Sequence, residues 1–181
     1  MAQVDPDFAA YVRGRQAHLL RIAVLMCGDV HQAEDLLQEA LVKLARHWSR
    51  VGGDRPDAYV RRILYHDNIT RWRRTRLETV TEEVPEPRGM QFGPAWEDRA
   101  DVRAALQELT PKQRAVLVLR FLEDLTQEQT AEVLGVSVGT VKSQTSVALA
   151  RMRDVLGTEW VEERGARQDA TGPDTQRGAG R

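Results

Sequence analysis

Near its C-terminal end the chain reads LTQEQTAEVLGVSVGTVKSQTSVALARMR over residues 125–153. This segment predicts two helices joined by a glycine turn. Thr126 and Ser137 stand where they would cap the two helices, because a side-chain hydroxyl accepts hydrogen bonds from free backbone N–H groups. Gly135 lies between them and supplies the left-handed conformation that ends a helix without a Cβ clash. We therefore expect a helix-turn-helix.

The second of these helices has two distinct faces. One face is mostly apolar at the helical repeat and is expected to pack on a core: it comprises Val141, Thr145, Ala148, Met152 and Val155. The opposite face carries short polar side chains and one cation: Thr140, Lys142, Ser143 and Ser146. Such groups let a helix approach base edges and donate hydrogen bonds in a DNA major groove. The alternative is an ordinary helical hairpin in a bundle.

Charge is unevenly distributed along the 181 residues, although the formal net charge is only −1. Residues 55–76 contain seven arginines against two aspartates, whereas residues 78–101 contain seven acidic residues against two arginines. In the basic segment, Tyr65, Asn68 and Trp72 stand between the arginines. Because Arg holds phosphates and aromatic rings stack on unpaired bases, this helix is predicted to bind nucleic acid. A solvated helix with core aromatics is the alternative.

No pattern in the sequence indicates catalysis, a metal or a cofactor. The four histidines, His18, His31, His47 and His66, lack HExxH spacing, and Cys27 is the single cysteine. The N-terminus has no apolar signal segment, and no apolar run approaches the roughly 18 residues that span a membrane. We therefore expect a non-enzymatic cytoplasmic protein without membrane insertion.

The remaining sequence predicts an all-α fold of two small helical domains. Residues 5–77 contain three helices: the first starts at Asp5-Pro6 and stops at Gly28, Asp29 caps the second, and Pro56 starts the third. Proline, glycine and acidic residues predict a flexible linker over 78–95. Helical periodicity resumes in residues 96–160, a four-helix domain that holds the helix-turn-helix. Residues 161–181 are expected to be a disordered tail.

The second predicted helix, which Asp29 caps, has a leucine-rich face beside an acidic one. The acidic face comprises Glu34, Asp35, Gln38 and Glu39. It is either a solvated surface or a docking surface for a basic partner.

The order of these parts resembles a small sigma-70-type RNA polymerase sigma factor of the extracytoplasmic-function group, which keeps only regions 2 and 4. The resemblance spans about residues 8–155. Within it, AEDLLQEALVKL is similar to region 2.2 and DAYVRRILYHDNITRWRRTR to regions 2.3 and 2.4. Residues 109–153, which include the specific string VSVGTVKS, are similar to region 4.

The resemblance implies a role for each surface. Core polymerase would be docked at its β′ clamp helices by Asp35, Gln38 and Glu39. The −10 promoter element would be contacted by Arg61, Arg62, His66, Trp72, Arg73 and Arg74. The −35 element would be read in the major groove by Ser137, Thr140, Lys142, Ser143 and Gln144. The β flap of polymerase is a further implied contact, and an anti-sigma factor is a partner that the family commonly has.

Two residues depart from the family's pattern. His66 stands where the family often has Asn, and Val147 stands where the recognition helix often carries a cation. The first departure affects base preference in the −10 element, and the second is expected to weaken −35 binding. The predicted function is promoter-specific initiation with core RNA polymerase, including help in melting the promoter. The alternative is a stand-alone helix-turn-helix regulator that binds DNA without polymerase.

Overall fold

The structure, a computed structural model, describes residues 5–52, 55–78 and 100–157, and within these ranges every regular element is helical. The first two ranges hold α1 (Pro6–Cys27), α2 (Val30–Arg46), α3 (Trp48–Val51) and α4 (Pro56–Glu78). The third holds α5 (Ala100–Gln107), α6 (Pro111–Leu117), the π-helical turn η2 (Val118–Leu122), α7 (Gln127–Leu134) and α8 (Val138–Leu156). The predicted all-α class is confirmed. The predicted tail, and all but the first residue of the predicted linker, lie outside the described residues.

Local sequence signals begin and end the helices at the predicted residues. Asp5 caps α1, and Asp29 caps α2 by accepting a hydrogen bond from the backbone N–H of Gln32 at 2.7 Å. Gly28, between the two helices, has a φ of +86°, which is the left-handed conformation of a helix C-cap. A Cβ at this glycine would also meet the side-chain amide of Gln107, which approaches from α5. The same residue therefore ends α1 and lies at a contact with the second half of the chain.

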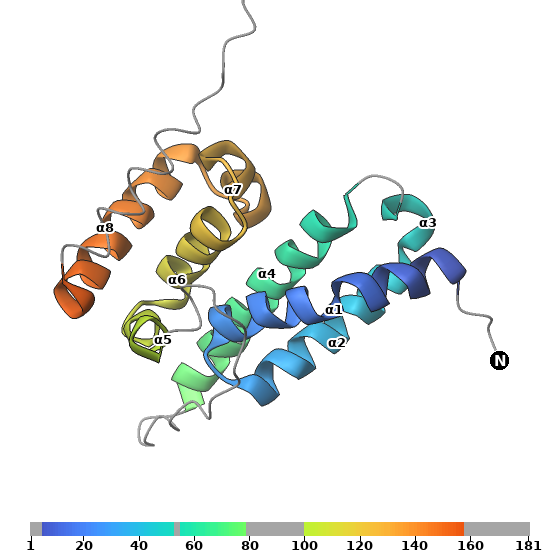
Figure 1. Ribbon diagram of the computed structural model, residues 1–181, viewed down its shortest axis with the longest axis horizontal. Coiled ribbons are helices and arrows are strands. Elements are labelled where there is room, and N and C mark those ends of the chain that lie inside the picture. The colour runs from blue at the N-terminus through green and yellow to red at the C-terminus, as the bar shows by residue number, and fades with distance from the viewer. Residues whose placement is uncertain (1–4, 53–54, 79–99, 158–181) are drawn as a thin grey trace, which may run out of the picture.

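Two groups of helices lie side by side in Figure 1: α1–α4, coloured blue to green, and α5–α8, coloured yellow to red. They share one hydrophobic core, because α1 packs on α2 and also on α6, and α4 packs on α6 and α7. Its largest fully buried side chains include Leu19, Ile22, Met26, Leu36, Leu44 and Leu64 from the first group and Leu106, Leu117, Leu119 and Met152 from the second. The sequence predicts two domains, but no local pattern in it predicts that they pack on each other.

The carbonyl oxygen of Met26, at the C-terminal end of α1, joins the two groups. Asn68 of α4 donates to this oxygen from Nδ2 at 3.1 Å, and Arg114 of α6 donates to it from Nη1 at 3.3 Å. The Arg114 guanidinium also donates, at 2.8–3.3 Å, to the carbonyl oxygens of Leu106, Gln107 and Leu109 at the end of α5. Burial lowers the pKa of Arg114 to about 10. We call the hydrogen bonds to Met26 from Asn68 and Arg114 the Met26 contact.

Candidate nucleic-acid interface

Helices α7 and α8 form the predicted helix-turn-helix. Thr126 and Gln129 cap α7 reciprocally: Thr126 Oγ1 accepts from the Gln129 N–H at 3.1 Å, and Gln129 Oε1 accepts from the Thr126 N–H at 2.8 Å. Gly135 ends α7 with a φ of +66°. Ser137 then caps α8 by accepting from the backbone N–H of Thr140 at 3.1 Å. The predicted caps and the predicted turn are confirmed.

The N-terminal half of α8 presents polar groups to solvent. Four of the five predicted −35 residues are exposed and the last is half-buried: Ser137, Thr140, Lys142, Ser143 and Gln144. Their hydroxyls are linked by local hydrogen bonds: Ser137 Oγ lies 2.9 Å from Thr140 Oγ1, and Ser143 Oγ donates to the Thr140 carbonyl at 3.0 Å. This half of α8 offers hydroxyls and one ammonium on a small surface, a set that suits base edges and phosphates.

The inner face of α8 follows the predicted stripe except at its end. Val141, Ala148 and Met152 are fully buried. Val155 is 48% exposed, so the prediction that it faces the core is wrong. The last turn of the helix instead places Leu156 against the core. Val147, on the outer side, is 52% exposed.

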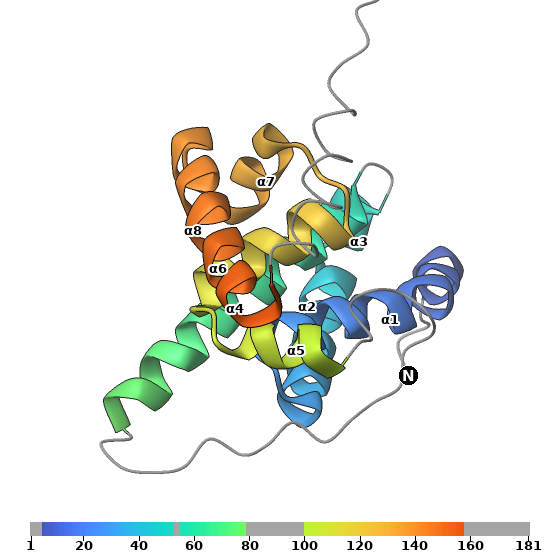
Figure 2. The same cartoon turned by 60° about the vertical axis from the view of Figure 1, so that its left-hand side comes forward.

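Helix α4 carries only part of the predicted basic and aromatic surface, because Trp72 is exposed but Tyr65 and Asn68 are buried. Exposed side chains along it are Arg62, His66, Trp72, Arg73 and Arg74. The guanidinium of Arg76 lies 5.2 Å from the centroid of the Trp72 ring, a cation–π contact. In Figure 2 the C-terminal half of α4 extends away from the other helices. Trp72, in this half, is 38% exposed.

Two arginines of α4 pair with carboxylates that are distant in the sequence. The side chain of Arg61 is 13% exposed and forms an ion pair with Glu123, in the turn after η2. Arg71 donates to Glu39 of α2 at 2.6 Å. Arg61 is therefore largely covered, whereas Arg71 stays in an exposed pair. A count of acids within the α4 segment does not include either carboxylate, because both lie outside that segment.

The predicted docking face of α2 lies opposite its buried leucines. Gln38 is exposed, and the side chains of Asp35 and Glu39 are 70% and 54% exposed. Arg71 lies beside both carboxylates, since its Nη1 is 4.0 Å from Asp35 Oδ2. The acidic face of α2 and the basic face of α4 are therefore neighbours.

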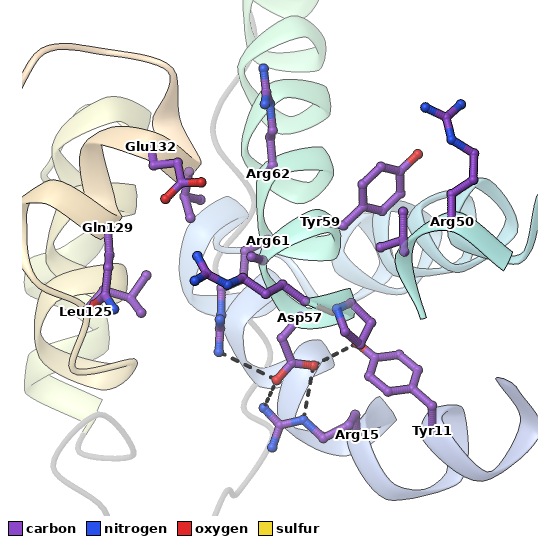
Figure 3. Close-up of a pocket in the computed structure, with 15 residues that line it drawn as sticks. Tyr11, Arg15, Arg50, Asp57, Tyr59, Arg61, Arg62, Leu125, Gln129 and Glu132 are labelled. Carbon is purple, nitrogen blue, oxygen red and sulfur yellow. Dashed lines mark hydrogen bonds and ion pairs between the residues drawn. The ribbon is translucent and has the colours of Figure 1, made fainter. Parts of the chain in front are cut away.

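A cavity of about 820 Å³ lies between the two helix groups, lined by α1, α4 and α7 among others (Figure 3). Asp57 on its wall accepts a hydrogen bond from the Tyr11 hydroxyl at 2.7 Å and pairs with the Arg15 guanidinium. Burial alone would raise the pKa of Asp57, but the hydrogen bonds from Arg15 and Tyr11 outweigh it, so this pKa lies below its ordinary value. Burial and the same carboxylate raise the pKa of Tyr11.

The helix-turn-helix also approaches the predicted −10 residues. A Cβ built on Gly135 would lie 3.9 Å from Nε2 of His66. Burial and then the neighbouring Arg62 lower the pKa of His66, while Asp67 opposes them. The lowered pKa favours the neutral form of the His66 ring. The structure brings this part of the −10 surface against the domain predicted to read the −35 element.

Neither a metal site nor a membrane-spanning helix occurs in the part of the chain that the structure describes. No three of its His, Cys, Asp or Glu side chains lie together as a metal would require. None of its helices combines the length and the apolar character needed to cross a bilayer.

Comparisons with known proteins give the family. Residues 11–78 match the family described as Sigma-70 region 2, and residues 105–154 match Sigma-70, region 4. The RNA polymerase sigma-E factor of Streptomyces coelicolor is 43% identical over 152 residues, which cover 83% of this chain and 86% of that protein. The ECF RNA polymerase sigma factor SigE of Mycolicibacterium smegmatis is 32% identical over 159 residues, which cover 83% of this chain and 62% of that protein.

The fold is similar to that of solved sigma factors. The sigma factor RpoE from Bartonella quintana, solved in complex with the anti-sigma factor NepR, superposes with a TM-score of 0.72 at 25% identity, covering 86% of this chain and 99% of that chain. CnrH, solved in complex with the cytosolic domain of CnrY, shares the fold with a TM-score of 0.56 at 22% identity, covering 91% and 89%. These matches confirm the resemblance, and the chain belongs to the sigma-70 family of RNA polymerase sigma factors, in its extracytoplasmic-function group.

Proposed function

We propose that this sigma factor binds core RNA polymerase and directs it to promoters by holding a −35 element with α8 and a −10 element with α4. One observation carries the proposal: two exposed surfaces suited to nucleic acid lie on different helix groups of one family member. These surfaces are the polar N-terminal half of α8 and the basic-aromatic C-terminal half of α4. A stand-alone helix-turn-helix regulator would use only the first.

At the −10 element, α4 would act on DNA as it opens. Arg62, Arg73 and Arg74 are exposed cations that would hold backbone phosphates. Trp72 has an accessible indole, which would stack on an unpaired base and so recover part of the free energy that unpairing costs. Helix α4 would thereby favour the melted promoter over the duplex.

At the −35 element, α8 would read duplex DNA. Its exposed hydroxyls and Lys142 lie on the first turns of the helix, the part that enters the major groove in helix-turn-helix proteins. Base edges accept and donate hydrogen bonds there in a pattern that distinguishes all four base pairs. The contact of α8 with the −35 element would determine which promoter is chosen, whereas α4 would favour the opening of the promoter DNA.

The protein would contribute binding rather than chemistry of its own. Asp35, Gln38 and Glu39 present an acidic surface that would dock on the β′ clamp helices, and region 4 would contact the β flap. The protein would act in the cytoplasm, where core polymerase is present. An anti-sigma factor is a further proposed partner, because RpoE of B. quintana, a protein of the same fold, was solved with one.

Transcription reconstituted from purified components tests this function. The chain is mixed with bacterial core polymerase and genomic DNA, and the 5′ ends of the RNA are sequenced. We expect a set of start sites that share two upstream elements and that are missing with core polymerase alone. Start sites that are unchanged by the chain, together with no co-purification with core polymerase, would contradict the proposal.

A further inference from the structure

Glu123 is a buried carboxylate at the boundary between the two helix groups. It lies at the end of η2, before the helix-turn-helix, and its side chain is 1% exposed. Nε2 of His18 on α1 is 2.7 Å from Glu123 Oε1, and Nη2 of Arg61 on α4 pairs with Oε2. A buried carboxylate is costly unless cations compensate it. The packing of α5–α8 against α1–α4, which we call the closed arrangement, supplies the Arg61 cation and places the His18 ring beside the same carboxylate.

The turn that carries Glu123 is held in shape by its own group of helices. The Leu125 N–H donates to the Leu119 carbonyl at 3.1 Å, and Arg120 donates from Nη1 to the Leu125 carbonyl. Asp124 has a φ of +49°, in the left-handed region that few residues other than glycine adopt. Backbone hydrogen bonds and a tight turn therefore direct the Glu123 carboxylate toward α1 and α4.

The same contact covers part of the −10 surface. Arg61 is directed at Glu123, and its side chain is only 13% exposed. One helical turn further along α4, His66 lies against the turn at Gly135. Arg62, between them, stays exposed. In the closed arrangement, Arg61 is thus covered and His66 lies close to the turn at Gly135. The C-terminal half of α4 stays open.

We propose that Glu123 is an intramolecular latch: its carboxylate takes the place of a DNA phosphate at Arg61 and holds the free protein in the closed arrangement. The latch rests on the function proposed above, and it adds Arg61, a residue that the family resemblance implies for the −10 element, to the phosphate contacts of α4. A carboxylate and a phosphate compete for the same guanidinium, so DNA reaches Arg61 only after Glu123 has left. A partner that binds the open arrangement better, such as core polymerase, shifts the population toward it.

The latch is distinct from the Met26 contact, which is the other polar link between the helix groups described above. Met26 is eight residues beyond His18 on α1, a separation of about 12 Å along the helix axis. Asn68 and Arg114, which donate to Met26, are outside the predicted DNA-binding set. The groups can therefore separate at the Glu123 end, where DNA would enter, while the Met26 contact holds the other end.

The substitution Glu123→Gln tests the latch in the full-length chain. It keeps the size of the side chain but removes the ion pair that joins Arg61 to the other helix group, leaving Arg61 with Asp57 of its own helix at 3.8 Å, which disfavours the closed arrangement. Asp124→Asn is the matched control, because it removes a charge from the adjacent, exposed residue. Spin labels at Ser49→Cys and Ala150→Cys, two exposed positions on α3 and α8, report the distance between the groups in a Cys27→Ser background.

We expect longer label-to-label distances in Glu123→Gln and wild-type distances in Asp124→Asn. The free Glu123→Gln chain should also bind a duplex carrying the −10 element found by RNA sequencing about tenfold more tightly than wild type does, through the population shift. Distances and affinity equal to those of wild type would overturn the latch. Longer distances without a gain in DNA affinity would overturn it too, because Arg61 would then be exposed without contributing to DNA binding.

A second variant keeps the latch testable if Glu123→Gln fails to fold. His18→Asn removes one partner of Glu123 and leaves the turn at residues 123–125 unchanged, so it should give a smaller shift in the same direction. Circular dichroism checks the helix content of each variant. Transcription with core polymerase separates the two proposals: a wild-type chain that fails to transcribe contradicts the sigma-factor function, whereas normal transcription with unchanged distances in both variants contradicts only the latch.

Discussion

Arg71 on the basic helix and Glu39 on the acidic helix are hydrogen-bonded to each other, Nη2 to Oε1, at 2.6 Å. The helix proposed to bind the −10 element and the face proposed to dock on polymerase therefore share a contact. The Glu39 side chain is 54% exposed, so a basic partner can reach it, but only in competition with Arg71.

Arg71→Gln should free Glu39 for docking. Because the pair is exposed, its loss should change the free energy of unfolding by less than about 1 kcal/mol in a urea titration. Affinity for core polymerase should rise by about two- to fivefold, measured by fluorescence anisotropy. Lys43→Gln is the control, since it breaks a different ion pair between α2 and α4, Lys43–Asp67 at 2.6 Å, without touching the docking carboxylates. The same gain in both variants would contradict a docking role for Glu39.

The double substitution Lys142→Ala and Ser143→Ala should weaken transcription that depends on the −35 element by about tenfold or more, because a good base contact contributes about 1–3 kcal/mol of discrimination. Both side chains are exposed, so helix content and core binding should stay at wild-type levels. Lys112→Ala, at an exposed lysine of α6, is the control. An equal loss of core binding would indicate misfolding rather than lost DNA contacts.

Val147→Arg should add a phosphate contact to α8. The valine is 52% exposed, so the substitution removes no core packing. We expect tighter binding of the holoenzyme to −35 DNA, with the slope of log affinity against log salt steeper by about one. Val155→Arg makes the same change at a site that is 48% exposed, at the far end of α8, and should leave the slope unchanged. Equal salt slopes for the two variants would indicate that the DNA does not contact α8 near residue 147.

The helices and their ends could be predicted from sequence because the signals are local. Asp29, Thr126 and Ser137 act within three residues of the backbone groups they cap, and Gly135 within one turn. The polar face of α8 follows from the helical repeat in the same way. The family resemblance rests on motifs built from these local patterns.

The contacts between the two halves could not be predicted from sequence. Arg61 and Glu123 are 62 positions apart, and no periodicity connects them. Glu123 follows the apolar run VLVLRFL. An acidic residue at that place in the sequence indicates the end of a helix and gives no sign of a buried ion pair. The apolar repeat of α8 predicts a buried Val155, but in the last turn Leu156 packs on the core and Val155 is 48% exposed, which the repeat alone does not reveal.

His66 should make promoter binding depend on pH. Its pKa is lowered, so the ring takes up a proton at a lower pH than an ordinary histidine does. The new cation next to Arg62 should then tighten −10 binding by about two- to fivefold between pH 7.5 and roughly 5.5, measured with the holoenzyme. His66→Asn should lose this increment, whereas His31→Asn, at a ring 91% exposed on α2, should keep it. A flat profile in wild type would contradict the role.

Asp57 should contribute stability that is lost in acid. Its pKa is lower in the folded protein than the ordinary value of about 3.9, so its ionised form favours folding above that pH. Asp57→Asn should therefore be less stable than wild type in urea at about pH 6. The gap should narrow as the pH falls below about 4 and the folded protein takes up the proton. Asp154→Asn, at an exposed aspartate of α8, should show no such gap. A difference in stability between wild type and Asp57→Asn that is constant with pH would indicate an effect of packing alone.

The carbonyl oxygen of Met26 has consequences for how the protein unfolds. It accepts from Asn68 in one half and from Arg114 in the other, inside a core that both halves build. If either half melts, the other loses a partner for a buried polar group and part of its apolar cover. In the closed arrangement the two sigma regions are thus one cooperative unit, and calorimetry of the free protein should record a single heat-absorption peak instead of one for each region.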